Sequence, residues 1–163
     1  LGDVYKRQLV KGVNRAWDAG LVVVVAAGNN GPRTMSITTP GISRKVITVG
    51  CSDDDREVLV GGNRMVDYSG RGPTAACICK PDLVAPGCSV VSCSSRADKY
   101  TIKSGTSMST PIVSGAVALL LERFPDMTNK DVKLRLRESS VDIGLPRNQQ
   151  GWGLLDVGKM IGK

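Results

Sequence analysis

The apolar run from Leu21 to Ala27 constrains the fold more than any other part of this sequence. It contains the consecutive valines Val22–Val25 and is too short for a typical helix. It therefore predicts a β-strand buried on both faces, as in a parallel sheet. Residues 9–17 carry apolar side chains at helical spacing, and Gly20 suits the end of that helix. A helix followed by a buried strand indicates an α/β fold.

Asn29 comes directly after this strand, in the segment Gly28-Asn29-Asn30-Gly31-Pro32. Ligands of open parallel sheets bind beyond the carboxyl ends of the strands, and the amide of Asn29 offers two N–H donors there. The same segment is also strong turn sequence. A donor to a ligand and a simple turn are both compatible with these residues.

Ser107 lies in a run of small residues, 104–111, directly before the apolar stretch 112–121. The stretch predicts a helix that is buried all round, with Pro111 in its first turn and Phe124-Pro125 at its end. The free N–H groups and the dipole at a helix N-terminus stabilise negative charge, which favours a nucleophile at Ser107. Serine is also a preferred helix cap, so this segment alone leaves both roles open.

Four segments together, in this order and spacing, resemble the subtilisin-like serine proteases, or subtilases: 23–32, 68–73, 80–87 and 104–111. A further segment, 151–156, resembles the turn before the last helix of that domain. The resemblance implies an α/β fold with three layers, a mainly parallel sheet and helices on both faces, incomplete at its N-terminal side. We expect residues 9–163 to form the C-terminal portion of such a peptidase domain. Residues 1–8 do not resemble the family and are expected to be a non-native leader.

The resemblance also assigns roles to individual residues. Ser107 matches the catalytic nucleophile of the family, and Asn29 matches the asparagine that donates an N–H to the oxyanion alongside the backbone N–H of Ser107. Ala26, Ala27 and Gly28 match one wall of the pocket for the substrate side chain that precedes the scissile bond. No metal ligand is among the matched residues. The resemblance implies no cofactor for the chemistry and leaves structural calcium open for a full-length parent.

The aspartate and the histidine of the family's catalytic triad have no match in this sequence. The chain has no histidine at all. A serine hydroxyl without an adjacent base is a weak nucleophile. We therefore expect a fragment of a serine endopeptidase that is nearly inactive alone and needs the missing N-terminal half of its domain as a partner. Its reaction would be hydrolysis of a peptide or protein substrate through an acyl-enzyme. The alternative is a non-catalytic pseudo-protease that acts as a peptide-binding module.

Charge and hydropathy argue against two classes of partner. With 22 Lys and Arg against 15 Asp and Glu, the chain carries a net charge of +7, but these residues are scattered and aromatic residues make up only 4%. The sequence therefore predicts no nucleic-acid partner. The longest apolar run is about half of the roughly 20 residues that a membrane span requires, so no membrane segment is expected.

Cysteines and acidic residues give weaker indications. The cysteines, at 51, 77, 79, 88 and 93, have no zinc-ribbon spacing, so free thiols, several of them buried, are expected. Free thiols favour a cytoplasmic or otherwise reducing setting without excluding secretion. The run 53–55 is three aspartates, which could bind a hard cation or form an exposed acidic turn.

Further local patterns predict the remaining elements. Residues 45–50 predict a second buried strand, and 58–63 predict a hairpin. Thr128 and Asp131 form a capping-box-like start for a helix that reaches about Glu138. Lys130, Lys133, Arg135 and Arg137 are expected on the charged outer face of that helix.

Overall fold

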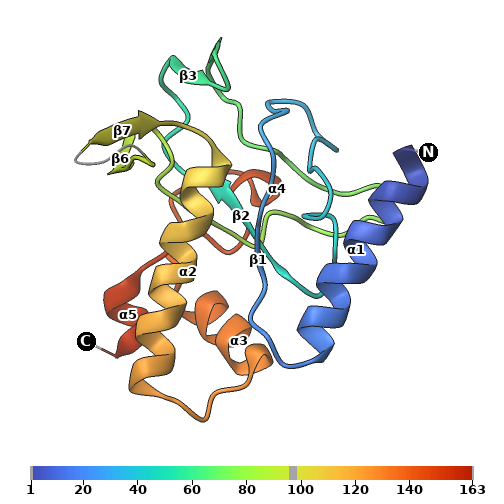
Figure 1. The fold of residues 1–163 in the computed structure, drawn as a ribbon, viewed down its shortest axis with the longest axis vertical. Helices are drawn as coiled ribbons and strands as arrows, with labels where there is room; N and C mark the ends of the chain where they lie inside the picture. The colour runs from blue at the N-terminus through green and yellow to red at the C-terminus, as the bar shows by residue number, and fades with distance from the viewer. Residues whose placement is uncertain (1, 96–98, 163) are drawn as a thin grey trace.

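The computed structural model describes residues 2–95 and 99–162, and Figure 1 shows its helices and strands. The strands are β1 (Val24–Ala26), β2 (Ile47–Cys51), β3 (Val58–Val60), β4 (Asn63–Met65), β5 (Leu83–Ala85), β6 (Val90–Cys93) and β7 (Tyr100–Lys103). The helices are α1 (Gly2–Asp18), α2 (Thr106–Arg123), α3 (Asn129–Ser139), α4 (Arg147–Gln150) and α5 (Val157–Ile161). None of the helices in the described part of the chain has the length and hydropathy that a membrane crossing requires.

The central sheet is parallel and has the strand order β1–β2–β5, which confirms the predicted α/β class. Val24 pairs with Ile47, and Val49 pairs with Leu83. β1 is therefore an edge strand of this sheet. Beyond β5, the pairing continues with one isolated parallel bridge between Val84 and Leu154. Among the described residues, no strand pairs with β1 on the side away from β2.

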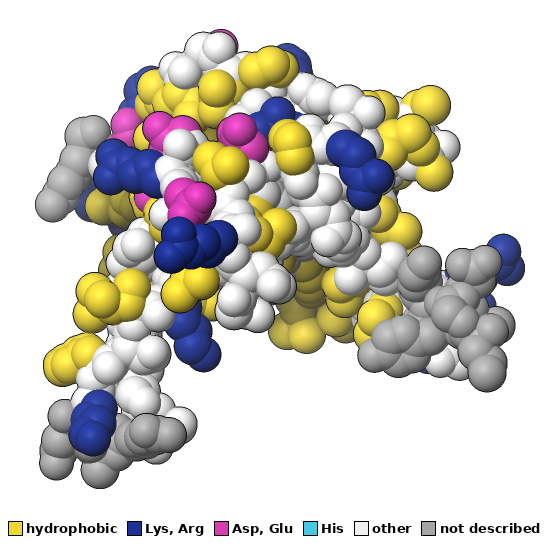
Figure 2. Space-filling model, turned by 90° about the horizontal axis from the view of Figure 1, so that it is seen from above, with side chains coloured by type: hydrophobic (Ala, Val, Ile, Leu, Met, Phe, Trp, Pro, Cys, Tyr) yellow, Lys and Arg dark blue, Asp and Glu magenta, His cyan; other side chains and the backbone are white. Residues whose placement is uncertain are grey.

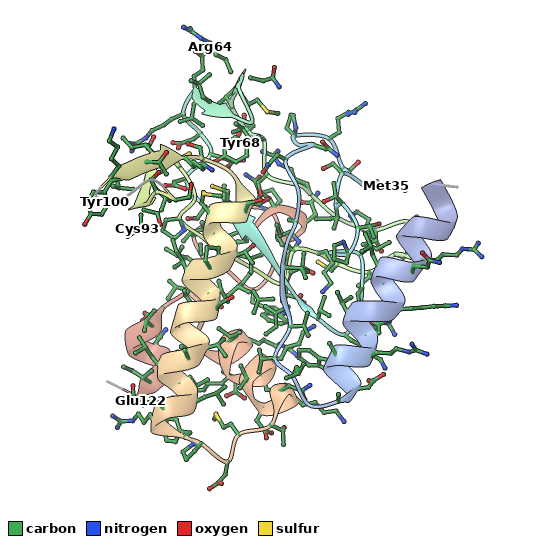
Figure 3. The ribbon with its side chains drawn as sticks, viewed as in Figure 1. Met35, Arg64, Tyr68, Cys93, Tyr100 and Glu122 are labelled. Carbon is green, nitrogen blue, oxygen red and sulfur yellow. The ribbon has the colours of Figure 1, made fainter. Side chains whose placement is uncertain are left out.

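Two antiparallel hairpins lie outside the sheet. The predicted hairpin is confirmed as β3–β4, and β6–β7 forms a second one directly before α2. In Figure 3, Arg64 and Tyr100 mark the outer parts of these hairpins, whereas Tyr68 points into the molecule. Tyr68 is fully buried.

One apolar cluster joins the sheet to the long helices. It contains Trp17 of α1, Val49 of β2, Val117 of α2 and Leu136 of α3 among its buried members. Asn129 at the start of α3 donates to the carbonyl oxygen of Trp17 at 2.7 Å, which ties the end of α1 to α3. The capping box predicted at Thr128 is present, with Asp131 as its partner. Helix starts that depend on neighbouring residues alone can be predicted from sequence.

Helix α1 includes the predicted 9–17 helix but begins at Gly2. Residues 2–8 form its first part, and their non-native origin stays a prediction.

Two elements are less buried than the sequence predicts. Val22–Val25 are only partly buried, because in the described part of the chain β1 pairs with β2 alone. Helix α2 buries one face, while Leu119 on another face is 50% exposed. The prediction that both elements are buried all round is therefore wrong for this chain. The exposed sides of β1 and α2 are apolar surface without a covering layer in the described structure.

The acidic run 53–55 is not an exposed turn, which corrects that expectation. Asp54 is 3% exposed and accepts a hydrogen bond from the Ser69 N–H at 2.7 Å. Burial raises the pKa of the Asp54 carboxyl, which the Ser69 N–H and the charge of Arg71 oppose. Asp53 accepts hydrogen bonds from the N–H groups of Gly87 and Cys88. The first two aspartates thus hold loops together, and only Asp55 is exposed.

Lys133 does not lie on an outer charged face as predicted. Its ammonium donates to the carbonyl oxygens of Arg44, Lys45 and Val46 at the start of β2. It also lies 3.5 Å from Asp82, which pairs with the buried ammonium of Lys80. Asp82 in turn accepts the N–H of Thr48 at 2.7 Å. A buried ion pair with these hydrogen bonds connects β2 to the segment that leads into β5.

We expect the free energy of unfolding of the wild type to increase with pH between about pH 8 and 10.5, when that of a Lys80→Met variant at the same pH is subtracted. Burial lowers the pKa of Lys80 from 10.5 to about 8, against the opposing charge of Asp82. In this window the unfolded chain binds more protons than the native chain, so the free energy of unfolding of the wild type increases. The gain relative to the variant should reach roughly 3 kcal/mol over the window. Urea denaturation at a series of pH values, with the thiols kept reduced, measures it.

A Lys130→Met variant is the matched control, since Lys130 is an exposed lysine on the same helix as Lys133. Its unfolding free energy should follow that of the wild type at every pH. A difference between wild type and Lys80→Met that does not change with pH would contradict the buried-lysine interpretation.

Candidate active site

The N-terminus of α2 is formed by a glycine that no other residue could replace without strain. Gly105 is the N-cap and has φ +137°, a backbone conformation that favours glycine. A Cβ atom at this position would also lie 3.2 Å from Asn29 Nδ2. Gly105 thus allows the turn 104–107 to approach the end of β1 closely.

Asn29 is held against this turn by its side-chain oxygen. Its Oδ1 accepts a hydrogen bond from the N–H of Thr106 at 3.0 Å and another from the Thr106 hydroxyl at 3.0 Å. The Thr106 hydroxyl accepts in turn from the Gly28 N–H at 3.2 Å. Because the oxygen is used in this way, the amide nitrogen is oriented away from Thr106. Among the described residues, Asn29 Nδ2 has no hydrogen-bond acceptor.

Ser107 follows Thr106 as the second residue of α2 and is exposed. Its Oγ has no hydrogen-bond partner among the described residues. Its N–H belongs to the first N–H groups of the helix, which have no carbonyl within the helix to bond. The side chain and the N–H of Ser107 are both available to a ligand at this end of the helix.

Pro111 lies inside α2 rather than in its first turn, which corrects the expectation from sequence. The helix begins at Thr106, so Pro111 comes after more than one turn. A proline there supplies no N–H to the carbonyl four residues earlier, which is that of Ser107.

A cleft of about 1020 Å³ begins at Asn29 and continues along the loop that follows β1. Its lining includes Asn30, Thr38, Thr39 and Ile42, and also Met35, which Figure 3 places at the edge of the molecule. The cleft is large enough for a peptide side chain and is open to solvent. Asn29 lines the cleft and is hydrogen-bonded to Thr106, whereas Ser107 itself does not line the cleft. Asn29 therefore connects the cleft to the turn that carries Ser107, and we treat the two as one candidate site.

The pocket-wall residues lie at the carboxyl end of β1, just before the cleft. Ala26 ends the strand, and the N–H of Ala27 donates to Val49 O at 2.8 Å. Gly28 faces the side chain of Thr38, since a Cβ at Gly28 would lie 2.3 Å from Thr38 Oγ1. The residues that line the cleft include Asn29 but none of these three.

The sequence model of the Subtilase family matches residues 2–153, which is most of the chain. The chain belongs to the subtilase family. The match includes both Asn29 and Ser107, and it covers the sheet and helix α2 that bring them together.

Curated relatives agree with this assignment. The chain is 43% identical to serine protease AprX of Bacillus subtilis, with 81% of this chain and 33% of AprX covered. It is 34% identical to subtilisin DY of Bacillus licheniformis, with 91% of this chain and 50% of the subtilisin covered. The chain thus spans a third to a half of the length of these relatives.

Solved structures show the same fold. A serine-to-alanine mutant of the protease domain of PatA superposes with a TM-score of 0.71 at 26% identity, covering 93% of this chain and 51% of that one. The prenylagaramide maturation protease PagA gives a TM-score of 0.71 at 24% identity and supports the fold alone. The predicted subtilase fold is confirmed.

The expectation of a reducing compartment gains no support from the relatives. One of them, from Natrialba magadii, is named a halolysin-like extracellular serine protease. The thiols are also less buried than predicted, because only Cys51 is buried while Cys77, Cys79 and Cys93 are exposed. Secretion is therefore not excluded.

Sequence reasoning missed Thr106 as a functional residue. It lies within the matched run 104–111, but its role depends on a contact with Asn29 from a distant loop. The type of residue at position 106 gives no local signal of that contact.

Proposed function

We propose that this chain is part of a serine-type endopeptidase that hydrolyses peptide bonds through an acyl-enzyme. Ser107 Oγ attacks the carbonyl carbon of the scissile bond, and the oxyanion that forms is bound by the Ser107 N–H and Asn29 Nδ2. The proton of the hydroxyl passes to a base and then to the leaving amine, after which water hydrolyses the ester. The observation that carries the proposal is the hydrogen bonding of Asn29 to Thr106, the residue before Ser107, which uses the side-chain oxygen of Asn29 and leaves its amide nitrogen free.

The base has to come from outside these residues, because the chain has no histidine. We propose that an N-terminal half of the same domain supplies it, together with the aspartate that orients it. The free edge of β1 and the apolar groove lined by Leu21–Val24, Ser114 and Val117 would be covered by that half. An unpaired edge strand beside exposed apolar surface is otherwise a site of aggregation.

Substrates and other partners follow from the site. A peptide or protein substrate would occupy the cleft that Asn29 lines, next to Ala26, Ala27 and Gly28 at the carboxyl end of β1. On the face shown in Figure 2, Lys and Arg side chains are spread out rather than gathered in a patch, which gives no support to a nucleic-acid partner. We propose no cofactor for the chemistry, and structural calcium in the full-length parent stays a prediction.

The second candidate function is a non-catalytic peptide-binding module, which the absence of histidine favours. A fluorophosphonate probe separates the two functions in the full-length parent. We expect the probe to label Ser107, and Ser107→Ala to abolish labelling, because only a serine activated by a base reacts with it. Ser109→Ala, which changes a nearby buried serine, is the control and should leave labelling intact. A folded parent that is not labelled would support the binding module.

A further inference from the structure

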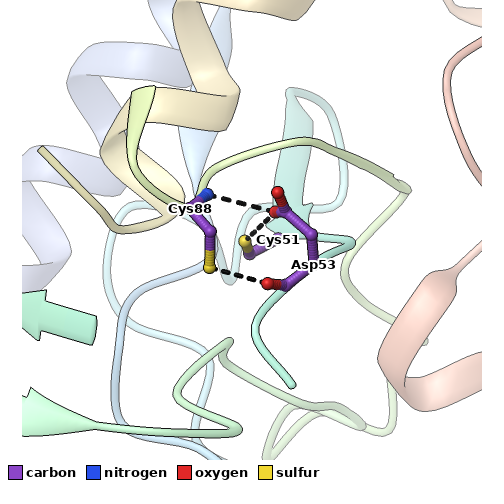
Figure 4. A group of neighbouring side chains, drawn as sticks. All are labelled: Cys51, Asp53 and Cys88. Carbon is purple, nitrogen blue, oxygen red and sulfur yellow. Dashed lines mark hydrogen bonds between the residues drawn. The ribbon is translucent and has the colours of Figure 1, made fainter. Parts of the chain in front are cut away.

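Two thiols, a carboxylate and a phenol meet below the turn that carries Ser107. Cys51 ends β2, Asp53 follows it, and Cys88 comes shortly after β5 (Figure 4). One ligand atom from each of these three residues lies within 4.8 Å of the others. The hydroxyl of Tyr68 lies 3.2 Å from the sulfur of Cys51 and 3.2 Å from that of Cys88.

The backbone fixes the carboxylate of this cluster in place. Asp53 Oδ1 accepts hydrogen bonds from the Gly87 N–H at 2.7 Å and the Cys88 N–H at 3.1 Å, and from the Cys51 thiol at 3.1 Å. Asp53 Oδ2 has no hydrogen-bond partner in the described part of the chain. Cys51 is fully buried, whereas Cys88 is partly exposed. Oδ1 is thus the carboxylate oxygen beside the thiols, and the Cys88 thiol donates to the carbonyl oxygen of Asp53 at 2.6 Å. The partial exposure of Cys88 leaves an approach from solvent on its side.

We propose that Cys51, Asp53 and Cys88 bind a thiophilic divalent cation such as Zn²⁺ or Cd²⁺. Cysteine sulfur and aspartate oxygen are both ligands of zinc, and a tetrahedral ion with bonds to sulfur of about 2.3 Å places two sulfurs about 3.8 Å apart. Tyr68 or water would take the fourth position. Calcium does not fit, because it requires six to eight oxygen ligands. Binding would form two metal–sulfur bonds and release the two thiol protons to solvent.

The sequence predicted no zinc site, because the cysteine spacing matches no zinc motif, and it left only a hard-cation site at residues 53–55 open. Cys51 and Cys88 lie far apart along the chain and meet only because β2 and β5 are neighbours in the sheet.

The proposed site is connected to Ser107 through the backbone. The carbonyl oxygen of Gly87 accepts the Gly105 N–H at 2.9 Å, and the Ser89 N–H donates to Ser104 Oγ at 2.9 Å. Gly87 is also closely packed, since a Cβ there would lie 2.8 Å from the sulfur of Cys51 and 2.4 Å from Ser109 Oγ. Coordination of Cys88 should thus displace the residues that support the turn 104–107, so we expect the ion to inhibit. This consequence rests on the proposed protease function, whereas binding itself does not.

Cadmium binding tests the site in a background where Cys77, Cys79 and Cys93 are changed to serine, since these exposed thiols could bind the ion elsewhere. The full-length parent is titrated with Cd²⁺ in the presence of a phosphine reductant, and the sulfur-to-cadmium charge-transfer absorbance is recorded. We expect a one-to-one complex. Cys88→Ser should raise the Kd for Cd²⁺ by more than about 100-fold. Loss of a residue that bonds the ion directly should cost more than the roughly 10–100-fold that loss of an outer-shell partner costs.

Asp53→Asn is the second variant, because it keeps an oxygen that can accept the Gly87 and Cys88 N–H groups. It should weaken Cd²⁺ binding while its cooperative unfolding is retained. The site is refuted if the background protein gives no charge-transfer band, or if Cys51→Ser, Cys88→Ser and Asp53→Asn all titrate like the background.

Fluorophosphonate labelling with and without Cd²⁺ distinguishes the two proposals. Cadmium should lower the labelling rate of the background protein but not that of Cys88→Ser. Cadmium binding without any labelling would refute the protease function and leave the metal site standing. Labelling without cadmium binding would refute the site alone, and binding that leaves the labelling rate unchanged would refute inhibition.

Discussion

Replacing Ser107 with alanine should lower kcat of the full-length parent by about 10⁶-fold. In subtilisin, loss of the nucleophile costs about 2 × 10⁶ in kcat, because oxyanion binding and substrate binding alone retain only a small part of the rate. Ser107 is exposed at the start of α2, so the substitution removes no buried contact. The folded structure should therefore be unchanged. Steady-state hydrolysis of a peptide substrate measures the loss.

Ser114→Ala is the matched control, since Ser114 is another serine of α2, further along the helix in the groove that the N-terminal half would cover. Its hydroxyl donates to the Thr110 carbonyl oxygen within the helix. We expect kcat within about twofold of wild type, because the substitution removes one hydroxyl away from the turn 104–107. If Ser107→Ala retains activity comparable to Ser114→Ala, then Ser107 is not the nucleophile.

Replacing Asn29 with alanine should lower kcat by about 10²–10³-fold with little change in KM. The figure is that for loss of one oxyanion donor in subtilisin, about 2.7–4 kcal/mol. The donor acts on the charge that develops in the transition state, so its loss affects kcat rather than ground-state binding. Separate determination of kcat and KM measures the effect. A rise in KM alone would indicate that Asn29 binds substrate without stabilising the oxyanion.

Thr106→Val tests how Asn29 is positioned. Valine matches threonine in shape but removes the hydroxyl that bonds Asn29 Oδ1 and Gly28, while the Thr106 N–H bond to Asn29 remains. We expect a smaller fall in kcat than for Asn29→Ala. In the double variant Thr106→Val, Asn29→Ala the two effects should not add, because Thr106 acts through Asn29. If the two effects add fully, Thr106 does not act through Asn29 on the oxyanion.

Local sequence patterns predicted the helices and strands that depend only on residues close together in the sequence. The capping box at Thr128, the hairpin at β3–β4 and the strand β2 all depend on neighbouring side chains or on a short apolar run. The subtilase resemblance predicted the fold, and the relatives confirm it. The site roles of Ser107 and Asn29 stay predictions that the geometry supports.

Contacts between distant segments could not be predicted. Lys133 was expected in solvent, but the carbonyl oxygens at residues 44–46 bind its ammonium, and nothing near position 133 in the sequence indicates this. The start of α2 depends on Gly105 packing against Asn29, so the position of Pro111 within the helix was misjudged. Burial of β1 was overestimated, because it depends on a neighbouring strand rather than on the valines themselves.

The central claim is that Ser107 and Asn29 act on one oxygen atom. A crystal structure of the full-length parent after reaction with a peptidyl phosphonate tests it most directly. We predict a covalent bond from Ser107 Oγ to phosphorus, with one phosphoryl oxygen about 2.7–3.1 Å from both Asn29 Nδ2 and the Ser107 N. An adduct on another residue, or a phosphoryl oxygen that points away from Asn29, would contradict the account.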